Sequence, residues 1–268
     1  MNPLAKMSAA QASGIRFVLM DIDDTLTTNG KLPAPAYTAL WNLHDAGLKV
    51  IPVTGRPAGW CDLIARQWPV DGVIGENGAL AFWEEPGSGG MARPALRQEF
   101  NPAALRNDHP ALTRIKERAF AETPGIRPAK DQFARMFDIA LDFAEEEPVL
   151  PLETAEQVRA IARAEGAQAK ISSIHVNIWM GIYDKLSMSE RFLKKRFGWA
   201  GDLCQVMFAG DSPNDEPMFA RFPLACGVAN VNRYCPYMKT FPAFAASKEG
   251  GEGFAEIAET ILRKRGAN

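Results

Sequence analysis

The stretch FVLMDIDDTLTTNG, from Phe17 to Gly30, begins as an apolar strand and ends as a polar turn. Four hydrophobic residues lead almost directly into three carboxylates, Asp21, Asp23 and Asp24. Clustered like charges make each other's ionisation less favourable, so folding by itself gains nothing from this arrangement. Either a solvated turn tolerates these charges, or a cation and a reaction require them. The rest of the chain decides between the two.

The composition of the 268 residues is that of an ordinary globular protein, with 47% hydrophobic and 23% charged residues. A net charge of −2 gives no electrostatic case for a nucleic-acid or membrane partner. The four cysteines show no CxxC spacing, which argues against a zinc site or a disulfide framework. The first 14 residues lack the apolar core of a signal peptide and predict a loose tail. No segment approaches the roughly 20 apolar residues of a transmembrane helix, so we expect a cytoplasmic protein.

Short apolar runs alternate with amphipathic stretches at both ends of the chain. Near the N-terminus we expect strands at 16–21, 48–55 and 70–78, with helices at 33–47 and 57–68 between them. Near the C-terminus we expect helices at 184–198, 214–222 and 253–265, and strands at 204–211 and 224–230. Strands that alternate with helices at this spacing predict a parallel sheet covered on both faces. The expected fold class is therefore α/β, with a doubly wound, Rossmann-like core.

The middle of the chain has a different character. The stretch 79–90 predicts a hairpin with a glycine-rich tip, and 133–146 predicts a strand with one exposed face. A helix is expected at 153–166, and one or two further strands at 169–180. We expect residues 85–182 to form an α+β domain inserted into a core made of residues 1–84 and 183–268. We interpret Trp41, Trp60 and Trp179 as core packing.

Polar and charged residues stand where the expected parallel strands end. Ligands of open parallel sheets bind beyond the carboxyl ends of the strands. The first strand ends in DIDDT, the second in VTGR, the third in GENG and the late strand in AGDSPND. Lys185 opens the helix that brings the chain back from the insert. These side chains should gather at one edge of the sheet.

This ordered set resembles the haloacid dehalogenase (HAD) superfamily of phosphotransferases. It is most similar to the Cof-like sugar phosphatases, the class IIB subgroup with an α+β cap between the second and third motifs. The first motif matches DIDDT at 21–25, the second Thr54 in VTGR, the third Lys185 in YDKLSM and the fourth GDSPND at 210–215. The sequence ENGA at 76–79 is also typical of this subgroup. The motifs together span most of the chain.

The resemblance implies a covalent phosphatase mechanism that needs a cation. Asp21 is the expected carboxylate nucleophile, and Asp23 the expected general acid and then general base. An ionised carboxylate beside a phosphate repels it, and Mg²⁺ with oxygen ligands removes that repulsion. The implied ligands are the Asp21 carboxylate, the Asp23 backbone carbonyl and the Asp211 carboxylate. Asp215 acts directly, through water, or by orienting Lys185.

Further candidates surround the phosphoryl group and the leaving group. Thr54 is expected to donate its hydroxyl hydrogen to a phosphoryl oxygen, although capping of the following helix is an alternative. Lys185 adds a positive charge to the same group. Arg56 and Asn77 follow strands at the active edge and are candidate substrate contacts. A local ion pair or a turn bond would explain these two residues almost as well.

The last strand of the insert carries a polar face. The alternation in SSIHVNIW sets Ser173, His175 and Asn177 on one side of the strand. Arg135 and Asp138 belong to another expected strand of the insert. We include His175 and Asn177 as candidate substrate contacts, able to recognise a sugar hydroxyl or a second charge. A solvated sheet face is the simpler interpretation.

The function expected from these features is a Mg²⁺-dependent phosphatase of small phosphorylated metabolites, with sugar phosphates as the expected class. A sugar phosphomutase would use the same core, and the motifs do not separate the two. A non-catalytic metabolite-binding protein is disfavoured by the intact set Asp21, Asp23, Lys185 and Asp211. Haloacid dehalogenation is disfavoured because that reaction requires no metal, so the arrangement of Asp23 and Asp211 would be left unexplained. We expect a monomer or a homodimer.

Overall fold

Strand β2 (Phe17–Met20) lies inside a six-stranded sheet, between β11 (Val206–Gly210) and β3 (Lys49–Pro52). The computed structural model describes residues 1–87 and 94–266. The sheet has the order β1-β13-β12-β11-β2-β3, and its strand pairs are parallel. The outer strands are β12 (Cys226–Gly227), β13 (Phe244–Ala245) and β1 (Asn2–Pro3). All four residues of β2 are buried, as expected for a parallel strand covered on both faces.

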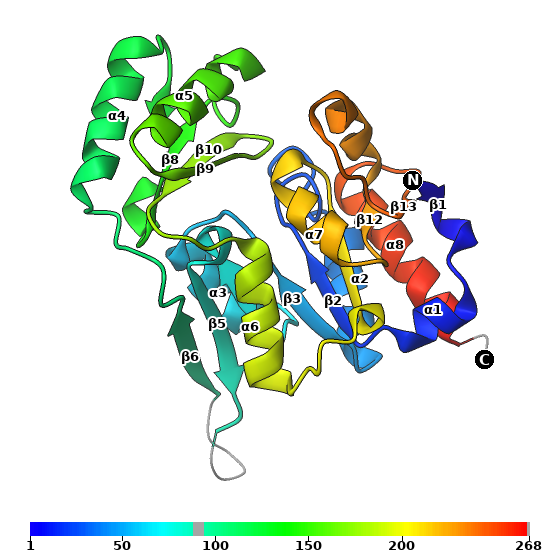
Figure 1. Ribbon diagram of the computed structural model, residues 1–268. Coiled ribbons are helices and arrows are strands. Elements are labelled where there is room, and N and C mark those ends of the chain that lie inside the picture. Colours follow the sequence, from blue (N-terminus) through cyan, green and yellow to red (C-terminus); the bar gives the residue numbers. More distant parts are fainter. Residues whose placement is uncertain (88–93, 267–268) are drawn as a thin grey trace.

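Helices cover both faces of this sheet (Figure 1). One face packs against α1 (Ala9–Gly14), α2 (Ala34–Asp45) and α8 (Gly250–Arg265). The other face packs against α6 (Lys185–Phe197) and α7 (Glu216–Arg221). Val18 and Met20 of β2 belong to the first hydrophobic cluster, and Phe17 and Leu19 belong to the second. This alternation confirms the doubly wound α/β core.

A smaller antiparallel sheet extends the core. It consists of β4 (Val73–Gly75), β5 (Leu80–Glu85) and β6 (Ala95–Phe100), and α3 (Ala58–Gln67) packs against β4 and β5. A parallel bridge between Val53 and Ile74 joins β4 to the end of β3. The expected third core strand is therefore short and shared between two sheets. The expected glycine-rich hairpin tip, at 88–90, lies outside the described residues.

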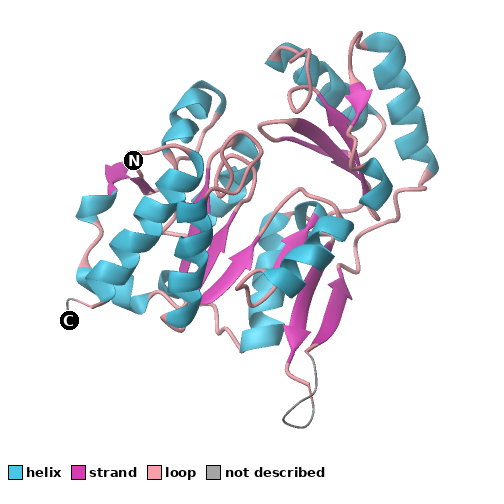
Figure 2. Cartoon of the chain, turned by 180° about the vertical axis from the view of Figure 1, so that it is seen from behind, coloured by secondary structure: helices cyan, strands magenta, loops and turns pink. Residues whose placement is uncertain are grey.

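A third sheet carries its own helices on one face (Figure 2). Its order is β7-β8-β10-β9, all antiparallel, with β7 (Arg127–Pro128), β8 (Asp138–Asp142), β10 (His175–Trp179) and β9 (Gln168–Ile171). Helices α4 (Pro110–Glu122) and α5 (Leu152–Ala164) pack with the apolar residues of β8, β9 and β10. We call this unit the cap. Its limits at residues 85 and 182 stay a prediction.

The N-terminal segment is ordered, so the expectation of a loose tail is wrong. Strand β1 pairs with β13, and Met7 and Ile15 are buried against the core. Ser8 accepts a hydrogen bond from the Gln11 backbone, and the Gln11 side chain accepts one from the Ser8 backbone. This capping box gives the short helix α1 a defined start.

Two expectations about aromatic residues are also wrong. Trp41 and Trp60 are each 44% exposed, whereas Trp179 is buried as expected. Phe133 is 91% exposed because the strand expected at 133–146 begins only at Asp138. Every residue of that strand is buried, so it has no exposed face. Its polar side is covered by the core.

Candidate active site

Asp21 lies at the carboxyl end of β2, where the sheet holds it firmly. Its backbone N–H donates to the carbonyl oxygen of Ala209 at the end of β11. The side chain is only 4% exposed, and its Oδ1 accepts a hydrogen bond of 2.8 Å from Lys185 Nζ. Burial raises the pKa of Asp21, Lys185 opposes the rise, and Asp215 and Asp23 add to it. A carboxylate placed in this way needs positive charge nearby to stay ionised.

Lys185 supplies part of that charge from the first position of α6. Its Nζ donates to Asp21 Oδ1 and to Asp215 Oδ1, both at 2.8 Å. Asp184 caps the helix, because its carboxylate accepts from the backbone N–H of Ser187 at 2.7 Å. Burial lowers the pKa of Lys185, but Asp21 and Asp215 outweigh it and hold the pKa above its ordinary value. The ammonium therefore stays charged.

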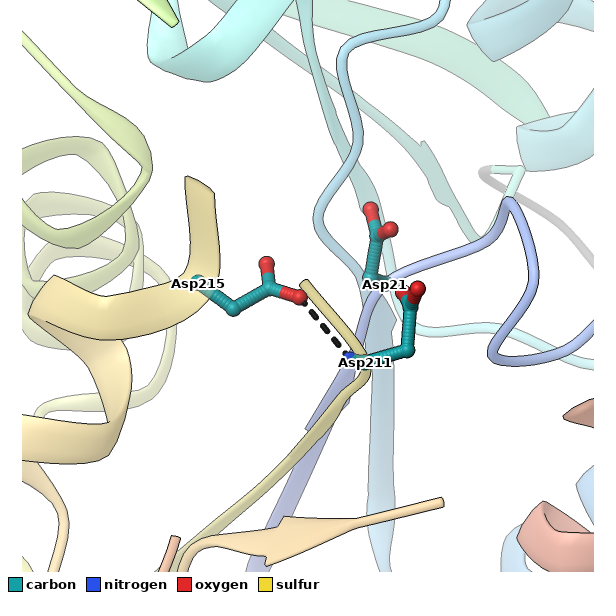
Figure 3. A group of neighbouring side chains, drawn as sticks. All are labelled: Asp21, Asp211 and Asp215. Atoms are coloured by element: carbon teal, nitrogen blue, oxygen red, sulfur yellow. Dashed lines mark hydrogen bonds between the residues drawn. The ribbon is translucent and has the colours of Figure 1, made fainter. Parts of the chain in front are cut away.

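The end of β11 brings two more carboxylates to Asp21 (Figure 3). Asp21, Asp211 and Asp215 each offer an oxygen atom within 4.8 Å of the others, and all three residues are buried. Burial raises the pKa of Asp211 well above its ordinary value, and Asp215 and Asp21 add to the rise. Asp211 accepts a hydrogen bond of 3.0 Å from the Thr25 hydroxyl. Three buried carboxylates beside one ammonium fit a divalent cation with oxygen ligands.

The hydrogen bonds of Asp215 distinguish it from the other two. Its Oδ1 accepts from Lys185, and its Oδ2 accepts from the backbone N–H of Asp211 at 3.1 Å. Both oxygens are therefore committed to protein donors. This pattern suits a residue that orients Lys185 and Asp211. Asn230, which the sequence did not single out, donates to the carbonyl oxygen of Asp24 at 2.8 Å and lies 3.4 Å from Asp211 Oδ2.

Arg56 holds the side chain of Asp23. Its Nε lies 3.0 Å from both carboxylate oxygens of Asp23, and its second amino group lies 2.8 Å from Oδ1. The guanidinium also donates to Glu145 at 2.7 Å and to Asp131 at 3.2 Å, both from the cap. Burial lowers the pKa of Arg56, but Asp23 and Glu145 outweigh it and hold the pKa above its ordinary value. The ion pair considered for Arg56 is therefore present and extends from core to cap.

Thr54 and Asn77 are direct neighbours, because the backbone N–H of Asn77 donates to the Thr54 carbonyl oxygen at 3.0 Å. Thr54 is fully buried, and its hydroxyl oxygen accepts from the backbone N–H of Arg56 at 3.0 Å. Asn77 is 2% exposed, and its side-chain amide has no hydrogen-bond partner among the described residues. A methyl group at Gly55 would lie 3.2 Å from Asn77 Nδ2 and 3.1 Å from Asn177 Oδ1. Only glycine allows this close approach without a shift of the two amides.

The polar face of the cap is buried over the site, so a solvated sheet face is the wrong interpretation. His175 and Asn177 are 2% and 3% exposed. His175 Nε2 lies 2.8 Å from Glu145, and the Asn177 amide donates to Asp138 at 3.2 Å. Burial alone would raise the pKa of Glu145, yet His175 and Arg56 hold it at about 2.

Two residues that the sequence analysis named without proposing them as site residues join the cap to the core. Arg135 donates to the carbonyl oxygen of Gly55 at 2.9 Å and to Asp138 at 2.9 Å. The Glu76 carboxylate accepts from the backbone N–H groups of Ala58 in the core and of Met136, Phe137 and Asp138 in the cap. The ENGA match was the only signal that pointed to Glu76.

The catalytic cavity lies where these groups meet. Asp21, Asp23, Arg56, His175, Asn177 and Asn214 line it together with Gly55 and Ser172. Its free volume of about 10 Å³ is room for about one water molecule. A phosphorylated metabolite is larger than this, so it would fit only if the cap shifted. Thr54 and Asn77 are not among the residues that line this cavity.

No helix within the described part of the chain is both long and apolar enough to cross a membrane.

Residues 18–92 match the family model described as haloacid dehalogenase-like hydrolase. A phosphoglycolate phosphatase of Pyrobaculum neutrophilum is 26% identical over 93% of this chain and 96% of its own length. The phosphoglycolate phosphatase of Pyrobaculum aerophilum is 25% identical over 92% of this chain and 96% of its own length.

Solved structures share the whole fold at lower identity. A Thermoplasma acidophilum protein superposes with a TM-score of 0.67 at 18% identity, covering 92% of this chain and 98% of that one. A HAD subclass IIB sugar phosphatase gives 0.61 at 15% identity, with 94% and 99% covered. The sucrose-phosphatase of Synechocystis superposes with a TM-score of 0.58 at 15% identity, covering 92% of this chain and 97% of that one. These likenesses establish the fold, including the cap. Together with the motif geometry, these matches support an enzyme of the phosphatase class that is similar to the haloacid dehalogenase-like hydrolases.

Proposed function

We propose that the protein is a Mg²⁺-dependent phosphatase of small phosphorylated metabolites, which acts through an aspartyl-phosphate on Asp21. The observation that carries this proposal is the contact of Lys185 with both Asp21 and Asp215, beside Asp211. It sets a nucleophile, a fixed positive charge and cation ligands around one point. Sugar phosphates are the substrate class that we propose first.

The attacking atom is Asp21 Oδ2, because Lys185 binds Oδ1 and Oδ2 accepts no hydrogen bond from the described residues. Its bond to phosphorus forms as the bond from phosphorus to the leaving oxygen breaks. Asp23 donates a proton to that oxygen. Asp23 then accepts a proton from the water that hydrolyses the aspartyl-phosphate. This hydrolysis releases phosphate and returns Asp21 to its free state.

The residues that would hold Mg²⁺ are Asp21 and Asp211, together with the backbone carbonyl of Asp23. An ion held there would supply positive charge to offset the negative charge of the phosphoryl oxygens. Asp215 has both oxygens engaged by protein donors, so we assign it to the orientation of Lys185 and of the Asp211 backbone.

Phosphoglycolate is a second candidate substrate. The two Pyrobaculum relatives carry the name phosphoglycolate phosphatase and match almost the full length of this chain.

The test is phosphate release from glucose 6-phosphate, phosphoglycolate and p-nitrophenyl phosphate, with Mg²⁺ and after its removal. We expect Mg²⁺-dependent release by the wild type and none by Asp21→Asn, because an amide cannot attack phosphorus. Asp62→Asn, a change of an exposed aspartate on α3, serves as the matched control. Wild-type activity in folded Asp21→Asn would contradict the covalent mechanism. Formation of an isomeric sugar phosphate without free phosphate would identify a phosphomutase instead.

A further inference from the structure

A second cleft opens beside the catalytic cavity, between the cap and the core. It has a volume of about 470 Å³, far more than the catalytic cavity. Ser172 and Asn214 line both spaces, so the two adjoin. The cap wall comes from α5 and β9, and β9 contacts the segment Pro213–Asp215 of the core. Figure 1 shows the β9 edge of the cap sheet turned toward α7.

The strand register places Lys170 at the junction of the two spaces. Lys170 pairs directly with Asn177 across the sheet, and paired residues point to the same face. Lys170 and Ser172 are also two residues apart, so they share that face about 7 Å apart along the chain. Because Ser172 and Asn177 line the catalytic cavity, Lys170 is the next side chain outward on the same surface.

The cleft has more positive charge than its own carboxylates neutralise. Arg159, Arg163, Lys170 and Lys239 line it, against Glu156 and Glu216. Glu156 pairs with Arg159, and Glu216 accepts from the backbone N–H groups of Lys239 and Thr240.

Three of these cations have no ion pair. Within 1–87 and 94–266, no carboxylate oxygen lies within salt-bridge distance of Lys170, Arg163 or Lys239. Partial burial lowers the pKa of Lys170, and Asp184 only partly opposes this. An anion in the cleft would supply the missing partner.

Another cleft beside the catalytic cavity has the opposite charge. A cleft of about 550 Å³ meets the catalytic cavity at Asp23 and Arg56. Its other walls include Asp24, Glu145, Glu146 and Glu147. An anionic leaving group is repelled there and attracted toward Lys170, so the charge pattern sets which way the substrate extends.

We infer that the cleft at Lys170 and Arg163 is a subsite for a second anionic group of the substrate, a carboxylate or a second phosphate. This inference rests on the proposed phosphatase function and narrows its substrate class. Lys170 lies about 7 Å beyond Ser172 along the strand, which suits a skeleton of several carbon atoms between the two charged groups.

The test compares substrates of matched size that differ in the second charge. Wild-type kcat/KM is measured with Mg²⁺ for 6-phosphogluconate against glucose 6-phosphate, and for fructose 1,6-bisphosphate against fructose 6-phosphate. We expect the doubly charged substrate to be preferred in at least one pair. The pair that shows the preference distinguishes a carboxylate from a phosphate.

Lys170→Gln and Arg163→Gln should each reduce that preference about 10- to 100-fold, the range of a lost hydrogen bond to a charged group. Lys116→Gln, an exposed lysine on α4, should leave the preference unchanged and is the matched control. Because Arg163 is exposed, its replacement should not disturb folding.

The outcomes separate this inference from the function on which it rests. Hydrolysis of p-nitrophenyl phosphate with no preference in either pair, or with a preference that both variants retain, would overturn the subsite alone. A folded wild type that releases no phosphate from any ester with Mg²⁺ would overturn the phosphatase function and the subsite together.

Discussion

Arg56 donates to both carboxylate oxygens of Asp23, so the expected acid–base residue is held in an ion pair. Proton transfer requires one of these oxygens to be free. Glu145 and Asp131 of the cap contact the same guanidinium and offer it other acceptors. A cap movement that shifts Glu145 or Asp131 would therefore also change the contacts of the guanidinium that holds Asp23.

Asp23→Asn should lower kcat by roughly 10²- to 10⁴-fold, the range for lost acid–base catalysis. Asp24→Asn is the matched control, because asparagine tolerates the positive φ of 56° at that position. The measurement is steady-state hydrolysis of a sugar phosphate by both variants. An unchanged kcat in Asp23→Asn would remove Asp23 from the acid–base role.

Lys185→Met should lower the free energy of unfolding by about 3–5 kcal/mol, as expected when one partner of a buried ion pair is removed. Asp21 and Asp215 would then lack their cation. Adding Asp215→Asn removes one of the unpaired charges and should recover part of the stability but none of the activity. Urea unfolding of both variants in EDTA measures this. No recovery in the double variant would show that repulsion between these carboxylates is not the cause.

At the scale of elements, the start of helix α6 positions Lys185, the lysine of the proposed mechanism. Asp184 is the N-cap residue of α6 and Lys185 is its first residue. The geometry of this N-cap therefore also sets the direction of the lysine side chain. Gly78 supports this end, because a Cβ atom there would collide with the Asp184 carbonyl oxygen. Its φ of 104° is also one that other residues rarely adopt.

Asp184→Ala should lower the free energy of unfolding by about 0.5–2 kcal/mol, the usual effect of a lost N-cap. Ser8→Ala, which removes the N-cap of α1, should have a similar effect on stability. Only Asp184→Ala should also lower kcat, because only α6 carries a catalytic side chain at its start. Urea unfolding and hydrolysis assays of both variants test this. Equal kcat values in Asp184→Ala and Ser8→Ala would show that the N-cap of α6 has no effect on catalysis.

At the scale of the whole molecule, the buried carboxylates of two distant segments converge on one point. Asp21 and Asp211 lie on neighbouring parallel strands, and their charges exceed what Lys185 neutralises. Chelation with EDTA should abolish hydrolysis, and Mg²⁺ should restore it. Asp211→Ala should sharply raise the Mg²⁺ concentration needed for half-maximal activity. Full activity after rigorous chelation would overturn the metal assignment.

The contact between cap and core should weaken in acid. The pKa of Glu145 is about 2 in the folded protein, against an ordinary value of 4.5. A lowered pKa means that the carboxylate stabilises the fold above pH 4.5, and that this contribution is lost as the pH falls toward 2. Urea unfolding at pH 7, 4.5 and 3 should therefore show a difference between wild type and Glu145→Gln that shrinks with falling pH. A difference independent of pH would contradict this linkage.

Local patterns in the sequence predicted much of the core. The buried run Phe17–Met20 predicted a central strand, because a parallel strand covered on both faces has to be apolar throughout. Carboxyl ends of parallel strands meet at one edge, so Asp21, Thr54 and Asp211 were expected near one another. The helices α2 and α8 followed from their apolar spacing.

The sequence alone therefore determined the α/β class, the order of the motifs and the edge of the sheet where they meet. Only the tertiary structure decided that Arg56 binds Asp23 and that the polar face of β10 is buried against the core. It also decided that Trp41 is exposed and that the N-terminal segment is ordered. The physical reason is that strand and helix periodicity depend on neighbours in the chain. Burial of a polar face and the choice of ion partner depend on surfaces brought together from distant segments, such as residue 56 in the core and residues 131 and 145 in the cap.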